Sequence, residues 1–518
     1  MKYTLHSRRA CGVLAAVVAT VLGTALAGDA AAQQTPDSPA AATGALGKPA
    51  VRLTLEEAID IARGGNPTYL MTANDESDAA WRQREAYAAF LPSVTVSGAG
   101  QYVAEGTPNL GFLTGADLGV GKVPSSYYSS YGLEGAIELS GATLFEAARA
   151  SANRRATSAQ VDAAGFTLAT EVTQRYLAAL RARDGVRLAR ENLESAQQSY
   201  DLAAGQFESG AAPRLDVTNA EVTRGRAEVA LLQAEQSAHT ELLRLSQTLG
   251  IAPDAPLELA STFEIFEPTW TLDELTERAL ASHPQLVAAR ASERAGVAGA
   301  RAAKMQYLPS LRLAGRLSGY SRQTGDDQAL IDDARSTFSR LQANCVYGNR
   351  IGALLGDAPA NCSEYDFTPD DEQRLLAAND VFPFNFTSNP ATVTLSLSFP
   401  IFNGFTRERQ LQEARSAADD ARHQRRAEEL ERRTAVSEAY VALVTSYRTV
   451  AIEERNVSAA AEQLELARER YRLGAGDIVE LAQAQATKAE ADNAHLNALY
   501  MFHENFAALE AAVGEPLR

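Results

Sequence analysis

The chain carries the tetrapeptide Phe90-Leu91-Pro92-Ser93 twice, the second time as Tyr307-Leu308-Pro309-Ser310, at an offset of 217 residues. The same offset relates the whole of Leu53–Tyr102 to Trp270–Gly319 without a gap. A repeat of this length indicates a duplicated structural unit, so each copy should contain the same order of elements.

A second pair of segments repeats at a larger offset. Glu171–Gly250 returns as Ala435–Gly514 at 264 residues, and the 47 additional residues lie largely between Tyr320 and Pro400. We therefore expect a first repeat over 53–251, a linker over 252–269, and a second repeat over 270–518 that contains an enlarged loop at 321–390.

Residues 1–27 have the pattern of a secretory signal peptide. A basic start and the apolar run Val13–Leu26 are followed by small residues that allow cleavage after Ala27 or Ala32. Residues 28–52 are rich in Ala, Gln and Pro and predict a flexible leader. The chain is therefore expected to leave the cytoplasm.

The formal net charge of −17 argues against a nucleic-acid partner, because binding to phosphates requires basic surface. An acidic, solvated surface that keeps the protein soluble accounts for this charge. A channel lining that passes cations or organic bases is the alternative interpretation.

Two cysteines remain after removal of the predicted signal peptide. Cys345 and Cys362 both lie in the enlarged loop, and in an oxidising compartment they are expected to form a disulfide. Such a bond would stabilise the loop by roughly 3 kcal/mol. A metal site is disfavoured because no His lies in the loop, and we expect no metal or cofactor.

Four segments alternate apolar with polar or small residues, as strands with one wet face do. They lie at about 93–102, 130–139, 310–319 and 392–399. Arg312 and Arg316 alternate with leucines in the third segment and are expected to face a lumen. A soluble sandwich has the same alternation.

Long helical hairpins follow each pair of strands. The expected helices span about Leu144–Phe207, Leu215–Leu249, Thr406–Tyr471 and Ile478–Val513. The longer member of each pair would reach on the order of 90 Å. Their Ala, Glu, Arg, Leu and Gln content is typical of long coiled-coil helices.

The number of strands predicts the assembly. An open sheet edge is not tolerated in lipid, and four strands are too few to close a barrel. Three chains with four strands each would form a twelve-stranded barrel with an aqueous lumen, whereas two chains would form an eight-stranded barrel filled by side chains. A homotrimer is the simplest conduit.

With these features the chain resembles the TolC-like outer-membrane efflux proteins over about Leu53–Leu517. The resemblance is carried by the Asn66-Pro67 and His283-Pro284 breaks and by the strand exit Ser398–Gly404. It is carried most by two hairpin tips, Phe207–Val217 and Tyr471–Leu481.

The resemblance implies an α+β membrane protein with a long α-helical coiled-coil barrel and a transmembrane β-barrel. It implies a homotrimer in the lipid of a Gram-negative outer membrane, with a large periplasmic part and no enzymatic activity. The implied function is a passive exit duct of a tripartite efflux or type I secretion system, docked to a periplasmic adaptor and an inner-membrane pump. A periplasmic coiled-coil scaffold outside the membrane and a stand-alone porin are the alternatives.

The resemblance also implies that the tips form the periplasmic gate and the adaptor-docking surface. Asp216 and Tyr471 match its gate positions, and Glu480 matches an acidic ring. Gly476 departs from the pattern at a gate arginine, and Arg214 and Arg472 are both candidates to replace that arginine. The site residues are Gly210, Arg214, Asp216, Tyr471, Arg472, Gly474, Asp477 and Glu480.

Two local features qualify these assignments. Gly210, Gly474 and Gly476 are expected to adopt positive φ in tight turns. Asp216 and Asp477 each follow a turn, so both also qualify as simple helix N-caps.

Overall fold

The computed structural model of the chain describes residues 51–107, 109–110, 113–114, 122–253, 257–261 and 263–518. The predicted signal peptide and all but the last two residues of the predicted leader lie outside these described residues.

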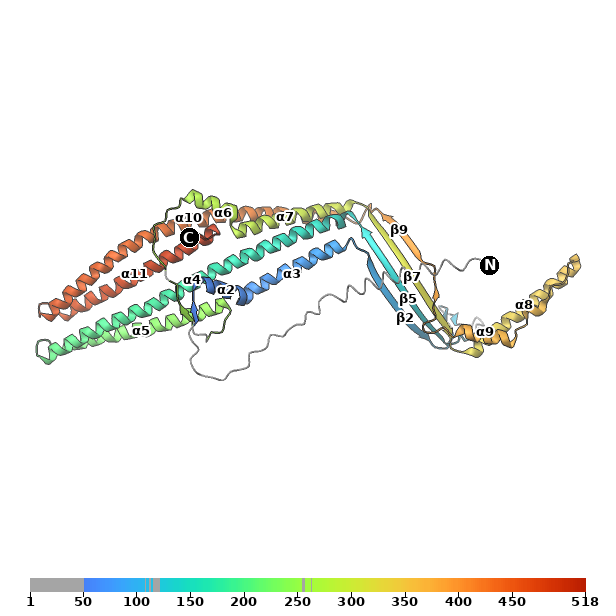
Figure 1. The fold of residues 1–518 in the computed structure, drawn as a ribbon, viewed down its shortest axis with the longest axis horizontal. Helices are drawn as coiled ribbons and strands as arrows, with labels where there is room; N and C mark the ends of the chain where they lie inside the picture. The colour runs from blue at the N-terminus through green and yellow to red at the C-terminus, as the bar shows by residue number, and fades with distance from the viewer. Residues whose placement is uncertain (1–50, 108, 111–112, 115–121, 254–256, 262) are drawn as a thin grey trace. The chain divides into compact units, whose positions relative to one another are not determined.

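Two sets of elements follow each other in the same order (Figure 1). The first repeat contains α2 (Leu55–Gly65), α3 (Pro67–Ala88), β2 (Ser93–Val103), β5 (Ser126–Leu139), α4 (Gly141–Glu208) and α5 (Arg214–Leu249). The second contains α6 (Leu272–Ser282), α7 (Pro284–Lys304), η2 (Met305–Tyr307), β7 (Ser310–Thr324), β9 (Thr392–Ser398), α10 (Thr406–Arg472) and α11 (Ile478–Val513).

Equivalent residues begin equivalent helices in the two repeats. The Thr54 hydroxyl accepts a hydrogen bond from the Glu57 N–H at 3.3 Å, and the Thr271 hydroxyl accepts one from the Glu274 N–H at the same distance. Each bond satisfies a backbone donor that the first turn of a helix leaves free. The two threonines therefore define the starts of α2 and α6.

A glycine follows the last helix of each repeat and ends it. Gly250 and Gly514 have φ of 71° and 90°. A Cβ on Gly250 would lie 2.1 Å from the Gly65 carbonyl oxygen, and one on Gly514 would lie 2.7 Å from the His283 Cα. Only glycine combines this backbone conformation with so close an approach.

The four long strands form one antiparallel sheet in the order β2-β5-β7-β9, and the short β8 (Thr387–Ser388) pairs with β7 on the same side as β9. Glu138 lies opposite Arg312 in the register, and their side chains approach to 3.8 Å. Ile137, Leu313 and Leu395 lie in line on the other face. The sheet is therefore polar on one face and apolar on the other.

Two short strands differ from the sequence prediction. β1 (Val51–Leu53) pairs with β6 (Leu257–Leu259). The end of the expected flexible leader and part of the expected linker are therefore strand. Three-residue strands show no period-2 pattern, so the sequence offered no signal for them.

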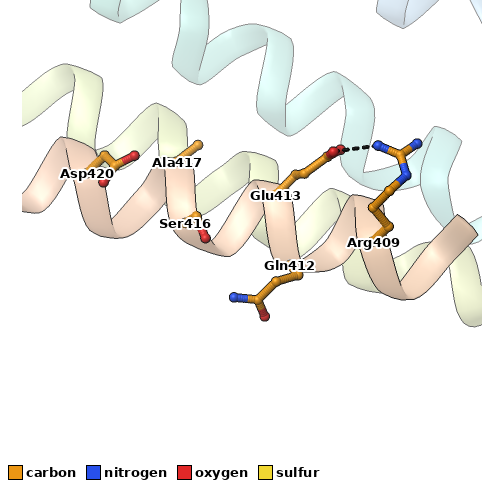
Figure 2. A pocket seen from close by; sticks show the side chains of 6 residues that line it. All are labelled: Arg409, Gln412, Glu413, Ser416, Ala417 and Asp420. Carbon is orange, nitrogen blue, oxygen red and sulfur yellow. Dashed lines mark hydrogen bonds and ion pairs between the residues drawn. The ribbon is translucent and has the colours of Figure 1, made fainter. Parts of the chain in front are cut away.

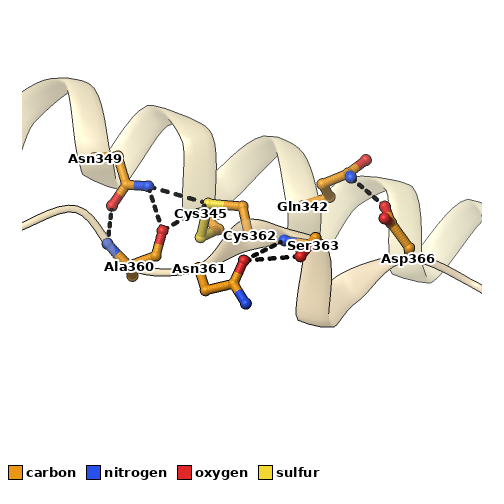
Figure 3. The surroundings of a disulfide bond; sticks show 8 residues. All are labelled: Gln342, Cys345, Asn349, Ala360, Asn361, Cys362, Ser363 and Asp366. Carbon is orange, nitrogen blue, oxygen red and sulfur yellow. Dashed lines mark hydrogen bonds between the residues drawn. A yellow bond between two sulfur atoms is a disulfide. The ribbon is translucent and has the colours of Figure 1, made fainter.

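The segment expected as an enlarged loop at 321–390 contains much regular structure. β7 extends to Thr324, and α8 (Asp327–Leu355), η3 (Cys362–Tyr365) and α9 (Pro369–Asn379) follow. The structure joins Cys345 of α8 to Cys362 of η3 by a disulfide (Figure 3). Between β2 and β5, the short strands β3 (Asn109–Leu110) and β4 (Leu113–Thr114) pair antiparallel.

Each repeat has its own hydrophobic core where its short helix packs on its long hairpin. Tyr176 of α4 is fully buried in the first core, and its hydroxyl donates to the Leu53 carbonyl at 2.7 Å. Phe502 of α11 is fully buried in the second, near Trp270, whose ring stacks on Phe506. Helix α7 packs against both α4 and α10 and so links the two repeats.

Among the helices of the described residues, none combines the length and apolar character that a membrane span requires.

Candidate functional site

The two hairpin tips have the same backbone turn. Gly210 and Gly474 have φ of 76° and 69°. In each tip the next residue closes the turn, because the Ala211 N–H donates to the Gln206 carbonyl and the Ala475 N–H donates to the Arg470 carbonyl, both at 2.8 Å. Both glycines therefore end their helix in a left-handed residue. Gly476 does not have positive φ, so the prediction was wrong for this third glycine.

The two aspartates of the tips have different roles. Asp477 is the N-cap of α11, and its Oδ1 accepts a hydrogen bond from the Glu480 N–H at 2.7 Å. Helix α5 begins instead after Pro213, which provides no side-chain cap. Asp216 lies in the first turn of α5, and its carboxylate is directed to another helix.

A partly buried hydrogen bond links the two tips. The Tyr471 hydroxyl of α10 donates to Oδ2 of Asp216 at 3.1 Å. The Tyr471 side chain is buried beside Ala203 and Ala220 of the first hairpin. Burial first, and the neighbouring Asp216 carboxylate second, raise the pKa of Tyr471 to about 12. The phenol therefore stays protonated at physiological pH and remains a donor.

Two further polar contacts surround this bond. Gln206 donates through Nε2 to the Tyr471 carbonyl at 3.1 Å, which gives α10 a second bond to the first hairpin. Within the second tip, the Arg470 guanidinium lies 2.8 Å from a Glu480 carboxylate oxygen. Both Gln206 and Arg470 are absent from the sequence-predicted site. They occupy the same position in the two repeats, and that equivalence is the signal that points to them.

Neither arginine considered from the sequence contacts Asp216. Arg472 pairs with Glu469 of its own helix at 2.7 Å. Arg214 is exposed and forms no ion pair with the described residues. A Cβ on Gly476 would lie 3.0 Å from the Glu480 carboxylate and 3.2 Å from the Arg470 Cβ. Glycine at this position therefore leaves room for the Arg470–Glu480 pair.

The two hairpins also present equivalent grooves farther from the tips. In the first repeat, α4 and α5 line a groove that α11 covers with Leu496 and its neighbours. The cover is held by the Tyr500 hydroxyl, which donates to Asp184 at 2.6 Å, and by the Arg181–Glu504 pair at 3.2 Å. We call this the first-repeat groove.

The second-repeat groove is built from equivalent positions on α10 and α11. Among the described residues, only these two helices line it, and Val441 and Met501 are exposed there, the former at 61%. The 264-residue offset relates six lining pairs, namely Ala178 and Ala442, Arg181 and Thr445, Ala182 and Ser446, Gly185 and Thr449, Ser237 and Met501, Glu241 and Asn505. The same groove is thus covered in one repeat and open in the other.

A second open face lies near the start of α10. Figure 2 shows Ser416, Ala417 and Asp420 on one stretch of this helix, with Arg409 paired to Glu413 along it. The same offset relates Ser416 and Asp420 to residues 152 and 156 of α4, which are alanines packed against α7. This part of α10 therefore also lacks a neighbour that α4 has.

The sheet is incomplete as well. Strands β2 and β9 lie at its two edges, and each pairs on one side only within the described residues. On the apolar face, Val96, Val393 and Leu397 are exposed, Val393 at 78%. Apolar side chains so arranged on a sheet need a non-aqueous neighbour.

No group of three His, Cys, Asp or Glu side chains within the described part of the chain is placed to hold a metal ion. The polar clusters at the tips are connected to one another by hydrogen bonds and ion pairs, an arrangement that suits a contact surface.

Proteins similar to this chain include an outer membrane export protein and a transmembrane channel. Protein CyaE of Bordetella pertussis is 25% identical over 385 residues, which cover 72% of this chain and 69% of CyaE. The pyoverdine export outer membrane protein OpmQ of Pseudomonas aeruginosa is 29% identical over 184 residues, 35% of this chain and 37% of OpmQ. The solved structure of CusC has the same fold, with a TM-score of 0.66 over 90% of this chain and 93% of CusC, at 17% identity.

The profile of the outer membrane efflux protein family matches residues 58–251 and 366–515. These segments include both helical hairpins and both tips, whereas α6, α7, β7 and α8 lie in the unmatched part between them. The predicted TolC-like fold, outer-membrane location and large periplasmic part are confirmed. The chain belongs to the outer membrane efflux protein family, whose members are channels of the outer membrane and not enzymes.

Proposed function

We propose that three copies of this chain form an exit duct that passively conducts substrates from the periplasm to the exterior. The observation that carries the proposal is the open second-repeat groove, which has a covered equivalent in the same chain. A duplicated chain that covers one of two equivalent grooves needs a further copy to cover the other.

The duplication also identifies the segment that would cover it. The α11 residues Asn493 and Leu496 in the first-repeat groove correspond to Val229 and Leu232 of α5. These two side chains are exposed, Leu232 at 61%. In the proposed assembly, α5 of one copy lies on α10 and α11 of the next and buries this apolar row.

The polar pairs that would meet in this interface are compatible. The Tyr500–Asp184 bond within the chain corresponds to Gln236 facing Arg448 of the next copy. The Arg181–Glu504 pair corresponds to Thr445 facing Thr240. No like charges would oppose each other at these positions, so nothing here disfavours the contact.

Three copies would also pair the free edges of the sheet. Four long strands per chain, with edges at β2 and β9, give twelve strands when the edges of three copies pair. Closure satisfies every backbone donor and acceptor in the hydrocarbon region. The exposed apolar face would then contact lipid, and Glu138 and Arg312 would line the lumen.

At the other end of the long helices, we infer a gate built from the tips. The Tyr471–Asp216 bond and the Gln206 contact hold the two hairpins of one copy together. Individual polar links of this kind are worth roughly 1–2 kcal/mol, so binding of a periplasmic adaptor would release them. In this gate Arg470, paired to Glu480, takes the place of the missing arginine at Gly476.

Transport energy would come from an inner-membrane pump joined to the adaptor, because the family consists of channels. The name of OpmQ describes export, which supports the outward direction for this chain. A periplasmic scaffold outside the membrane, the alternative considered from the sequence, has no support from the family assignment.

A cysteine pair across the proposed interface tests the trimer. With Leu232→Cys and Val441→Cys in the same chain, mild oxidation in outer membranes should produce covalent trimers on a non-reducing gel. Either cysteine alone should produce none. The oxidation is verified with Ser129→Cys and Ser321→Cys within one chain, whose native hydroxyls lie 2.7 Å apart. Only monomers from the Leu232→Cys and Val441→Cys variant, under oxidation that joins this control pair, would contradict the proposed interface.

A further inference from the structure

The insertion between β7 and β9 carries a surface that the rest of the channel does not explain. Helix α8 has no equivalent element among the described residues of the first repeat. In its last turns Tyr347, Ile351, Leu354 and Leu355 are exposed, Leu354 at 86% and Leu355 at 75%. Positions 347, 351 and 354 lie on one side of a helix. We call these four residues the α8 stripe.

The opposite side of α8 is occupied. Cys345 forms the disulfide with Cys362, and the Asn349 amide exchanges two hydrogen bonds of 2.8 Å with the backbone of Ala360 (Figure 3). The returning chain therefore covers one side of the helix and leaves the α8 stripe on the other. The disulfide fixes which side is open.

The insertion is attached firmly to the sheet. The Asn379 amide forms two hydrogen bonds of 2.8 Å with the backbone of Thr324, the last residue of β7. Just beyond α9, the Phe382 N–H donates to Gln323 at 3.0 Å, and the Phe382 ring packs on Tyr127 of β5. These contacts hold the end of the insertion on the strands, and only two residues separate the end of β7 from the start of α8. The proposed closure of the barrel would therefore bring three insertions to the same level.

Charge is distributed unevenly along α8. Residues 326–340 include four aspartates and two arginines, whereas Leu341–Leu355 contains a single charged residue, Arg350. The first half suits solvent, and the second half suits an apolar neighbour. A helix that lies on a membrane surface usually has several Lys or Arg residues beside its apolar side, and this half has only one.

We propose that the α8 stripes of three copies pack against one another and form a crown at the outer end of the barrel; the proposal rests on the trimer of the proposed function. The four side chains expose on the order of 500 Å², less than the ~800 Å² per partner that a stable interface between free proteins buries. The patch is thus small for an independent partner, but within a trimer the effective concentration of its equivalents is high.

The threefold symmetry of the proposed trimer also favours contact of each α8 stripe with the α8 stripes of the other two copies. Close to a threefold axis, each side chain meets its own equivalents, so a charged residue would meet like charge and an apolar residue would meet apolar surface. Leu354 and Leu355 are apolar and would therefore meet apolar surface. The charged Arg350 lies beside the α8 stripe and is not part of it.

Disulfide trapping in the full-length protein in outer membranes tests the crown. A Leu354→Cys variant, mildly oxidised and then denatured by heat, should run largely as a covalent dimer, because two of three cysteines can pair. The matched control is Ala377→Cys on α9, an exposed helical position of the same insertion away from the α8 stripe, which should stay monomeric. No dimer from Leu354→Cys, or equal dimer from both variants, would overturn the crown.

The Leu232→Cys and Val441→Cys pair is measured in parallel and separates the two proposals. A trimer trapped at that pair without a dimer at position 354 would refute the crown alone. Failure at both places would refute the proposed trimer as well.

The second measurement is the thermal stability of the trimer after a charge is introduced into the α8 stripe. Leu354→Asp should lower the temperature at which the trimer dissociates on a gel by several degrees, and Ala377→Asp should leave it unchanged. Equal temperatures for the two variants would overturn the crown.

Protection of the thiol introduced by Leu354→Cys from a charged maleimide, without any cross-link, would also overturn the crown, because that result would assign the α8 stripe to lipid or to a foreign protein.

Discussion

The first and second helical hairpins have the same length pattern, the same glycine turn and equivalent grooves, yet only the first groove is covered. Leu496 of α11 lies over the first-repeat groove, whereas Val441 and Met501 of the second-repeat groove remain exposed. The 264-residue offset makes the two surfaces equivalent, so the difference between them is what the proposed trimer explains. In that proposal each chain is part of a ring of hairpins, and another copy would supply the cover.

The largest expected effect comes from placing a charge in the proposed cover. Leu232→Asp should abolish the trimer while each copy keeps its helical content, because an unpaired carboxylate buried between copies costs several kcal/mol. Native mass spectrometry in detergent and circular dichroism measure the two properties. Leu496→Asp, the equivalent change within the chain, should instead lower the unfolding temperature of the chain itself. The same change in mass and in unfolding temperature for both variants would contradict the proposal that Leu232 covers the groove of another copy as Leu496 covers the groove of its own chain.

The next largest expected effect is a loss of stability at low pH, caused by a buried histidine. His503 of α11 is buried beside Phe263 and Phe502, and desolvation by burial lowers its pKa to about 4. Because the folded state disfavours the proton, stability is full above pH 6.5 and falls as pH decreases toward 4. The loss should be about 2 kcal/mol at pH 5.

His239, the equivalent residue in the first repeat, is exposed and provides the control. His503→Gln should reduce the drop in unfolding temperature between pH 7.5 and pH 5, and His239→Gln should not change it. A drop that persists in full in His503→Gln would show that other groups cause the acid sensitivity.

The gate gives a smaller effect. Tyr471→Phe removes the hydroxyl that donates to Asp216, a bond to a carboxylate worth about 2 kcal/mol. We expect higher single-channel conductance in a planar bilayer. Tyr447→Phe is the control, because its ring packs on Phe502 of the same hairpin, away from the tips. Unchanged conductance in Tyr471→Phe would exclude this bond from the gate.

The smallest effect should have the opposite sign. Phe207 is the first-repeat equivalent of Tyr471, and Glu480 is the second-repeat equivalent of Asp216. In a ring of hairpins Phe207 would lie near Glu480 of the partner subunit, where it has no hydroxyl to donate. Phe207→Tyr should add a bond of roughly 1 kcal/mol and lower the conductance. Increased conductance would contradict the equivalence at the tips.

Much of the fold follows from the sequence because the repeats support each other. The proline after each α3-type helix and the alternation around Arg312 predict strands in both halves, and β2, β5, β7 and β9 lie where this pattern places them. Helix α8 has no equivalent in the first repeat, so no second copy was present to correct its interpretation as a loop. β1 and β6 are too short for any periodic signal.

The candidate site was less predictable. The family resemblance marked Tyr471 and Asp216 separately as gate positions, but their hydrogen bond and the Arg470–Glu480 pair are seen only in the structure. The sequence left Arg214 and Arg472 as open alternatives because side-chain direction at a helix end is set by the turn, which the residue types alone do not define. The covered and open grooves required the packing of α11 on α4.

The most direct test measures mass and conductance on the same detergent-purified sample. We expect a particle of three chains that conducts in a planar bilayer, and loss of both properties in Leu232→Asp. A particle of one chain that conducts ions would contradict the proposal that this polypeptide cannot form the channel alone.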